Sequence, residues 1–467
     1  MSSAAAKAGS IGRGPRGLPL IGVAASFRGD PLGYFVDLMH RYGDVVWFRV
    51  GRAPVVMLNH PRAIRHVLQD NHRNYHKSAF YRPLKPLLGR GIFLSEDATW
   101  LEQRRRARPS FAGPRFEFMA ARIVDATTDM LARWRAEGAG ATIRILPEMM
   151  RLTLDSAARA FFATELTDQH TPVFDALTVM LRQAERRVWA TLPVPDKLAM
   201  YARPSYRRAV ADLDRFVWAL IEDRRRDPLG EDDLLTRLVH AYEPVDEHDQ
   251  TILRDEVVSI VTAGHETTAC ALAWALCLLS RHPDAAARLR REVDEVLGGR
   301  APTLADLERL DYTRMVFEEA MRLYPPVWTL SRVALEDDEI DGVRIPAGTT
   351  TMLCPYAVHR HPAFWTAPET FDPERFAPGA DRDRPRHAYF PFGGGPRVCL
   401  GNRFAMMEGQ VMLAMLAQAV DVTLEPGQSL EPEPMITLRP REATLMRLHW
   451  REPTDATHSA PPFAAGI

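Results

Sequence analysis

One ten-residue segment constrains the fold of this chain more than any other feature. Residues 392–401 read Phe-Gly-Gly-Gly-Pro-Arg-Val-Cys-Leu-Gly, so Cys399 follows a glycine-rich turn and precedes a helix predicted over Leu400 to about Val420. Glycines let backbone N–H groups turn toward one point, and a helix N-terminus carries a positive partial charge. Both effects stabilise a thiolate. The chain must therefore either present this cysteine to a partner or bury it as a small core residue.

A thiolate that stands alone indicates a particular kind of metal centre. A single cysteine without companions cannot build a zinc site of four protein ligands. Haem iron needs only one such ligand, because the porphyrin supplies four others. Arg397, two residues before Cys399, could pair with a haem propionate through two nitrogens. Taken alone, the cysteine could equally be a buried core residue.

Length and composition favour one large globular domain. The chain has 467 residues, of which 46% are hydrophobic and 25% are charged, and this excludes disordered and collagen-like chains. No internal repeat and no Gly/Ser-rich linker divides it. We expect a flexible N-terminus over residues 1–14, a single domain over 15–452 and a disordered tail over 453–467.

Residue periodicity predicts a mainly α-helical protein with small β-sheets. Val45–Val50 and Pro54–Leu58 are β-rich runs separated by Gly51, which predicts a hairpin. Between residues 120 and 280, apolar residues recur at helical spacing. Short β-type runs follow residue 324 and continue to Cys399. An alternating βαβ architecture is excluded.

Charge and cysteine content exclude several classes of partner. The formal net charge is −1, so no overall field attracts nucleic acid or acidic lipid. Four cysteines without a Cys-x-x-Cys pair are too few for a disulfide scaffold. The longest uncharged stretch in the apolar region, Thr267–Ser280, is shorter than the roughly 20 residues of a membrane helix. We expect a cytoplasmic protein with no membrane anchor and no nucleic-acid partner.

A second motif, Ala263-Gly264-His265-Glu266-Thr267-Thr268, lies in a helix predicted over Leu253–Leu279. Its small residues would let a flat cofactor approach the helix, and an acid beside a threonine can relay protons. A zinc-protease motif is excluded because it needs a second histidine where the chain has Ala269. Threonines that bond back to their own helix are the simpler alternative.

Two further pairs have helical spacing. Glu319 and Arg322 share one helix face, and Arg375 downstream offers another cation. Trp100 and Arg104 lie one turn apart and could both reach an anionic group. Considered singly, each pair could be an ordinary surface feature.

Together these motifs resemble the cytochrome P-450 family of haem-thiolate monooxygenases. Residues 392–401 match its haem-binding signature at every fixed position, Glu319 and Arg322 match its Glu-x-x-Arg pair, and residues 263–268 match its oxygen-activation motif. The motifs run in family order over roughly residues 15–450. Without a membrane anchor or fused flavin domain, the chain is similar to the soluble bacterial members.

The resemblance implies a role for each motif. Cys399 would be the axial ligand of haem b, and Glu266 and Thr267 would be the catalytic residues that manage protons and water. The other implied cofactor-binding residues are Trp100, Arg104, Ala263, Gly264, Arg332, Phe392, Arg397 and Gly401. Glu319, Arg322 and Arg375 would form a structural network that braces the cysteine segment. The implied substrate-facing residues are Phe80, Tyr81, Leu84, Ala263, Val327, Trp328 and Leu330.

The implied reaction inserts one atom of O2 into a C–H or C=C bond of an apolar substrate. Electrons would come from NAD(P)H through a ferredoxin or flavodoxin and its reductase, and the enzyme would be a monomer. Fatty acids, terpenoids, steroids and aromatic compounds all remain possible substrates. A peroxide-driven enzyme and a haem-based sensor or carrier are alternatives, which the Glu266–Thr267 pair disfavours. The arginines expected to form a basic docking surface are Arg104, Arg105, Arg106, Arg108, Arg382, Arg384, Arg386, Arg397 and Arg403.

Overall fold

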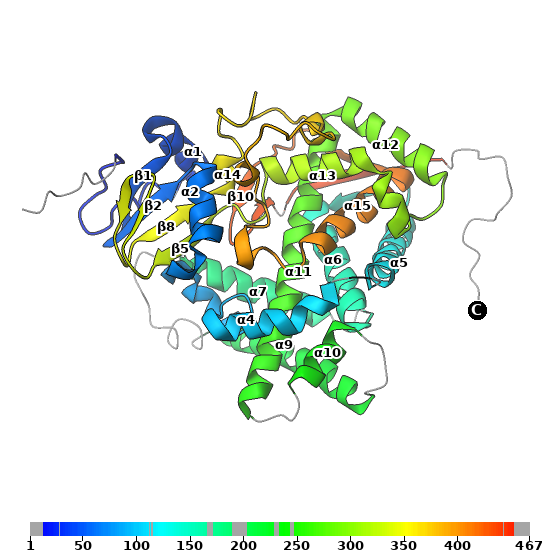
Figure 1. Ribbon diagram of the computed structural model, residues 1–467. Helices are drawn as coiled ribbons and strands as arrows, with labels where there is room; N and C mark the ends of the chain where they lie inside the picture. Colours follow the sequence, from blue (N-terminus) through cyan, green and yellow to red (C-terminus); the bar gives the residue numbers. More distant parts are fainter. Residues whose placement is uncertain are drawn as a thin grey trace, which may run out of the picture.

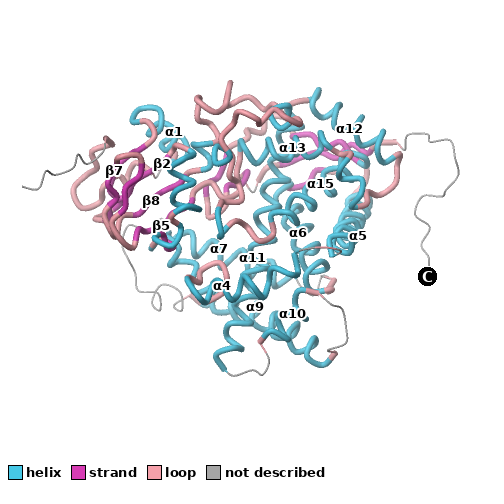
Figure 2. Tube along the Cα trace, in the orientation of Figure 1, coloured by secondary structure: helices cyan, strands magenta, loops and turns pink. Residues whose placement is uncertain are grey.

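The computed structural model describes residues 13–27, 29–111, 113, 115–165, 171–188, 203–227, 233–242, 247–441 and 443–452. The tail expected over residues 453–467, and all but two residues of the expected N-terminal segment, lie outside these ranges. The described ranges are mainly helical with small sheets, as predicted (Figures 1 and 2).

The helices surround one long central helix, α11, which crosses the middle of the molecule in Figure 1. It packs against α6, α13 and α15. The described α-helices are α1 Pro31–Tyr42, α2 Pro61–Arg65, α3 Lys85–Leu88, α4 Asp97–Ala107, α5 Arg115–Ala136, α6 Ile145–Phe162, α7 Thr171–Val188, α9 Pro204–Arg226, α10 Leu234–Ala241, α11 Glu247–Arg281, α12 Pro283–Leu297, α13 Asp311–Leu323, α14 Pro355–Val358 and α15 Asn402–Ala419. The helix predicted over Leu253–Leu279 is the central part of α11.

The largest sheet lies beside the helical part, at the left of Figure 1, in the order β1-β2-β8-β5-β3. The predicted hairpin is its edge, with Gly51 at φ 60° between the two strands. The strands are β1 Val45–Val50, β2 Ala53–Leu58, β3 Tyr75–Lys77, β4 Thr142–Arg144, β5 Leu330–Ala334, β6 Asp338–Ile340, β7 Val343–Ile345, β8 Thr350–Leu353, β9 Val420–Leu424, β10 Pro432–Pro434, β11 Leu438–Pro440 and β12 Leu445–Trp450.

The core gathers around α11 because this helix is apolar on most of its circumference between Ala269 and Leu279. Trp274 of α11 stacks on Tyr324 with ring centroids 3.7 Å apart. The indole N–H of Trp274 donates to the carbonyl of Leu438, which attaches β11 to the helix. A second apolar cluster joins α1 to the five-stranded sheet. Tyr324 packs against both clusters and so joins the helical part to the sheet.

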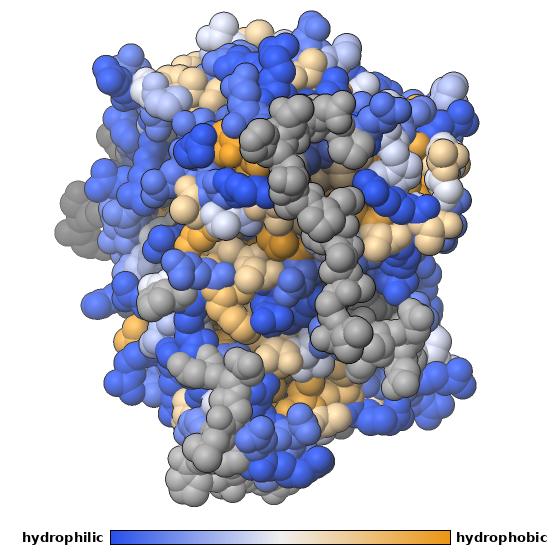
Figure 3. Space-filling view, turned by 90° about the vertical axis from the view of Figure 1, so that its right-hand side faces the viewer, coloured by the Kyte–Doolittle hydropathy of each residue, from blue (hydrophilic) through white to orange (hydrophobic). Residues whose placement is uncertain are grey.

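No helix in the described part of the chain is long and apolar enough to cross a membrane. The face that Figure 3 shows is mainly hydrophilic, with hydrophobic side chains in smaller patches between the polar ones.

One buried carboxylic acid joins three helices of the core. Glu408 of α15 has no solvent exposure, and its Oε1 accepts a hydrogen bond from Ser156 of α6 at 2.7 Å. Burial raises the pKa of Glu408 to about 8, although hydrogen bonds from Ser156 and Thr268 of α11 oppose the rise. The folded chain therefore keeps this carboxyl protonated at neutral pH.

We predict that Glu408→Gln makes the free energy of unfolding less dependent on pH. An unfolded glutamate loses its proton near pH 4.5, whereas the folded one keeps it up to about pH 8, so wild-type stability falls as pH rises through this window. The glutamine variant should gain on wild type by up to about 1.4 kcal/mol per pH unit. Urea unfolding of both proteins across this range measures the difference. A Glu117→Gln control, at an exposed site on α5, should track wild type, and a pH-independent difference for Glu408→Gln would contradict the prediction.

Candidate active site

The cysteine segment forms a loop that approaches α15 and ends at its N-cap, Gly401. Gly393 and Gly395 have φ angles of 73° and 63°, a region that L-residues with side chains rarely adopt. A Cβ on Gly395 would lie 1.9 Å from the Leu68 carbonyl oxygen, so this position also requires a close backbone approach. The glycine-rich sequence is thus explained by the path of the loop.

Cys399 differs from the other three cysteines of the chain. Cys270, Cys277 and Cys354 are buried core residues, and burial raises the pKa of each thiol. The Cys399 side chain is exposed, although surrounding protein atoms desolvate its thiol and raise its pKa. The backbone N–H of Gly401 and the Arg104 guanidinium oppose that rise, because both favour the thiolate. Cys399 is therefore accessible, and its thiol lies close to a backbone donor and a cation.

Positive charge gathers at one side of this hollow. Lys77 of β3 and Arg332 of β5 are direct cross-strand neighbours, and Arg397 of the cysteine loop lies near both. Burial and the two arginines hold the pKa of Lys77 well below its ordinary value. Glu96 opposes this shift and pairs with Arg397. Since like charges directly opposite each other in a sheet are destabilising, this arrangement calls for an additional anion.

Aromatic rings flank the same cations. The Arg397 and Arg104 guanidinium carbons lie 4.3 and 5.8 Å from the centroid of Trp100. The Lys77 ammonium lies 4.3 Å from the ring centroid of Phe93. The structure thus brings Trp100, Arg104 and Arg397 together, while their role at a propionate stays a prediction.

Lys77 is a candidate binding residue that the sequence reasoning missed. It lies three residues before Phe80, which was expected to face substrate, and nothing near it in the sequence indicates an anion site. Its only distinction in the sequence is that lysine is rare in this chain, with four lysines against 55 arginines. Only the pairing of β3 with β5 shows that it joins Arg332.

Helix α11 presents two residues of its motif in different directions. Ala263 is exposed, and the Thr267 hydroxyl donates to its carbonyl oxygen at 2.8 Å. A Cβ on Gly264 would instead lie 3.5 Å from Phe161 and 3.7 Å from Ala157, both on α6. These are ordinary van der Waals distances, so Gly264 faces α6, and its expected role at the cofactor stays a prediction.

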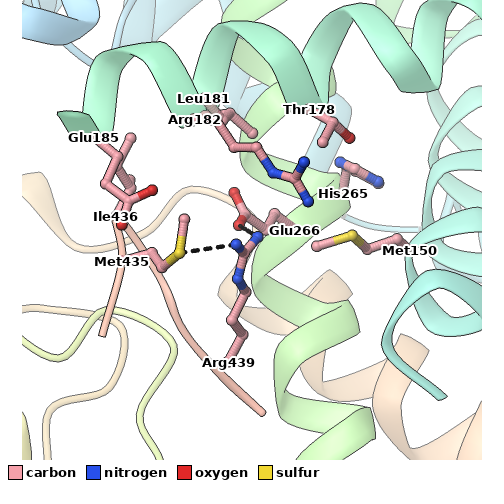
Figure 4. A pocket seen from close by; sticks show the side chains of 10 residues that line it. All are labelled: Met150, Thr178, Leu181, Arg182, Glu185, His265, Glu266, Met435, Ile436 and Arg439. Atoms are coloured by element: carbon pink, nitrogen blue, oxygen red, sulfur yellow. Dashed lines mark hydrogen bonds and ion pairs between the residues drawn. The ribbon is translucent and has the colours of Figure 1, made fainter. Parts of the chain in front are cut away.

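Glu266 is held on another side of the helix, in the pocket of Figure 4. Its Oε1 accepts a hydrogen bond from Thr437 at 2.7 Å and lies 3.8 Å from Nη1 of Arg439 on β11. Burial raises the pKa of Glu266, and these two partners oppose the rise. Glu185 of α7 lies at the same pocket, and burial raises its pKa to about 7. The Glu266 carboxyl and the Thr267 hydroxyl are therefore each bonded to a different group.

Glu319, Arg322 and Arg375 meet as the sequence predicts. Two nitrogens of Arg322 donate to the two carboxylate oxygens of Glu319 at 2.6 and 2.8 Å, and both side chains are fully buried. Arg375 Nε lies 3.5 Å from Glu319 Oε1. This bidentate pair connects α13 to the segment that leads to the cysteine loop.

The residues expected to face substrate divide into two groups. Phe80, Tyr81, Val327 and Leu330 are partly buried, whereas Leu84 belongs to the main core. Trp328 was also expected at the substrate, but its indole is 2% exposed and packs in the cluster between α1 and the sheet. Its N–H donates to the Met435 carbonyl oxygen, a partner that a buried indole requires.

This arrangement fits haem. The accessible thiol of Cys399 supplies a single soft ligand, and no cluster of three or more potential metal-ligating residues competes with it in the described ranges. The cations around Trp100 supply partners for two propionates. The exposed Ala263 leaves one face of α11 uncovered by other protein atoms.

Comparison with known proteins decides the family. The cytochrome P450 family model matches residues 13–446. The chain belongs to the cytochrome P450 family. It is a P450 monooxygenase, and its haem is the cofactor that the family implies.

Relatives in sequence and in structure match this chain over nearly its whole length. Cyclooctatin synthase of Streptomyces melanosporofaciens is 36% identical over 435 residues, covering 91% of this chain and 92% of the relative. Pentalenene oxygenase of Streptomyces avermitilis is 32% identical over 451 residues, covering 95% and 98%. The crystal structure of the cytochrome P450DA heme domain superposes with a TM-score of 0.83 at 26% identity, covering 96% and 99%.

We predict that Lys77→Met weakens haem binding by this P450. Removing the ammonium takes away one cation of the cluster, and we expect about a tenfold loss of haem affinity, equivalent to ~1.4 kcal/mol. Haem titration of the apoprotein, followed by absorbance, measures this. Lys85→Met, at an exposed lysine on α3, is the matched control. Equal affinities for the two variants would mean that Lys77 contacts no propionate.

Proposed function

We propose that this P450 inserts one oxygen atom from O2 into an apolar cyclic terpenoid. The observation that carries the proposal is the exposed Cys399 sulfur, which lies among the cations that suit haem propionates. The relatives named for pentalenene and for cyclooctat-9-en-7-ol act, by those names, on an alkene and an unsaturated alcohol. The partly buried Phe80, Tyr81, Val327 and Leu330 provide apolar surface suited to such a molecule.

The residues of the chain have separate tasks in this function. When bound, haem supplies the oxidising power, and a thiolate ligand favours cleavage of the O–O bond. Cys399 would be that ligand, while Trp100, Arg104, Arg332, Arg397 and Lys77 would hold the propionates. The Thr267 hydroxyl bonds back to Ala263 O, at the open face of α11, and can position a proton there. Glu266 would take up and release protons in the pocket of Figure 4, which it lines.

We further propose that electrons arrive from NAD(P)H through a separate ferredoxin or flavodoxin and its reductase. Arg105 and Arg108 near the C-terminal end of α4 are exposed, and so are Arg382, Arg386 and Arg403 around the cysteine loop. Arg384 is engaged elsewhere, since it donates to the Arg375 carbonyl oxygen at 2.5 Å and lies over Trp365. The exposed arginines would form the basic surface that an acidic partner recognises.

We predict that Thr267→Ala uncouples the enzyme. The variant should bind haem and terpenoid like wild type, but the lost hydroxyl no longer positions a proton, so coupling should fall about tenfold or more. The measurement is product formed per NAD(P)H consumed, with a terpenoid selected by a spectral binding screen. Thr128→Ala is the matched control, because Thr128 makes the same hydrogen bond to a carbonyl four residues earlier, in α5. Unchanged coupling in Thr267→Ala would move the proton donor elsewhere.

We predict that reversing two charges at the C-terminal end of α4 slows reduction by a ferredoxin. The double variant Arg105→Glu with Arg108→Glu should lower the association rate at low salt about tenfold or more, and its rate should depend less on ionic strength. Stopped-flow reduction across a salt series measures both effects. Arg52→Glu with Arg62→Glu, at exposed arginines beside the five-stranded sheet, controls for net charge. Equal rates and salt slopes for the α4 variant and wild type would exclude this surface.

A further inference from the structure

His359 and Arg322 are joined by two reciprocal contacts. The Arg322 guanidinium Nη1 donates to the His359 carbonyl oxygen at 2.9 Å. In return, His359 Nδ1 lies 3.3 Å from the Arg322 carbonyl oxygen. Both residues have no solvent exposure. The histidine is therefore tied, side chain and backbone, to the residue that pairs with Glu319.

The other ring nitrogen of His359 reaches Phe390, just before the cysteine loop. The backbone N–H of Phe390 donates to His359 Nε2 at 3.0 Å. A backbone N–H can only donate, so Nε2 must be an acceptor and the proton of a neutral ring must lie on Nδ1. Burial, together with the charges of Arg322 and Arg360, lowers the pKa of His359 well below its ordinary value. Both ring nitrogens thus have a fixed role in one tautomer.

From Phe390 the contacts continue to the sulfur ligand. Gly393 N–H donates to the Phe390 carbonyl oxygen at 3.0 Å, and Cys399 N–H donates to the Phe392 carbonyl oxygen at 3.0 Å. The ring of His359 also packs against the rings of Tyr389 and Phe390, at 5.1 and 5.5 Å between centroids. His359 therefore positions Phe390, two residues before the cysteine loop, and Phe390 in turn bonds to Gly393 within the loop.

We propose that His359 is a positioning residue for Cys399, which couples the buried Glu319–Arg322 pair to the cysteine loop and thereby fixes where the sulfur stands. The inference rests on Cys399 being the iron ligand. The Glu319–Arg322 pair itself makes no contact with Phe390 or Cys399 among the hydrogen bonds of the described residues, whereas His359 contacts both the pair and Phe390. Groups that orient a metal ligand typically change metal affinity or activity by about 10- to 100-fold when removed.

The test uses the haem-loaded, full-length protein and a spectroscopic readout. His359→Leu should still bind haem, but the ferrous carbon monoxide complex should lose its thiolate band about tenfold faster than wild type, and the reduction potential should shift. His359→Gln offers both an acceptor and a donor, and should restore most of the wild-type behaviour. His359→Asn carries the same groups on a shorter side chain and should not.

Two controls separate positioning from general stability. His361→Leu removes a histidine from the same turn, whose Nε2 lies 3.3 Å from Asp44 instead of contacting the loop. Val293→Ala truncates a fully buried residue of α12 and lowers stability at a distance. Both controls should keep the wild-type band and potential.

The outcomes are distinct. If His359→Leu matches Val293→Ala in melting temperature, band lifetime and potential, His359 is a core residue and the proposal is wrong. If His359→Leu does not fold, the thiolate bands of His359→Gln and His359→Asn are compared instead. A longer-lived band in the glutamine variant supports the proposal, and equal bands in the two variants overturn it. If wild type itself shows no thiolate band, the assignment of Cys399 as the iron ligand fails, and the role proposed for His359, which rests on it, fails with it.

Discussion

The site depends on one buried ion pair, Glu319 with Arg322. Removing two charges from water is costly, and the attraction between them offsets that cost only when their remaining hydrogen-bonding groups are satisfied. Here they are: Arg322 also donates to the carbonyl oxygens of His359, Pro368 and Thr370, and Glu319 accepts from Asp372 N–H. Removing one partner of such a pair costs about 3–5 kcal/mol.

The hydrogen-bond partners explain why this pair matters to the site. Each carbonyl that Arg322 binds belongs to the irregular segment between α14 and the cysteine loop, which has few backbone hydrogen bonds of a regular element to hold it. A guanidinium with donors in fixed directions can hold several such carbonyls at once. A loop without regular structure thereby becomes rigid enough to carry a metal ligand, since its geometry is set by a side chain of the adjacent helix α13.

The sequence predicts the elements of this site better than their relative placement. The cysteine loop, the long helix and the bidentate pair are each contained in a short stretch, where glycine conformation, apolar periodicity or i,i+3 spacing acts locally. The hairpin at Gly51 was predicted for the same reason. Such features follow from neighbouring residues, and the surrounding fold changes little about them.

The remaining features depend on contacts between segments far apart in the chain. Lys77 becomes part of the cation cluster only because β3 pairs with β5, in a register that places it opposite Arg332. A shift of one residue would turn it to the other face of the sheet. Likewise, Gly264 faces α6 because two helices cross there, a matter of packing that helical spacing within α11 does not determine. The position of Trp328 also depends on a distant segment, because its indole N–H donates to the carbonyl oxygen of Met435, more than a hundred residues later. Local pattern therefore identifies the chemistry of the iron ligand, while strand register and helix packing select the residues that surround it.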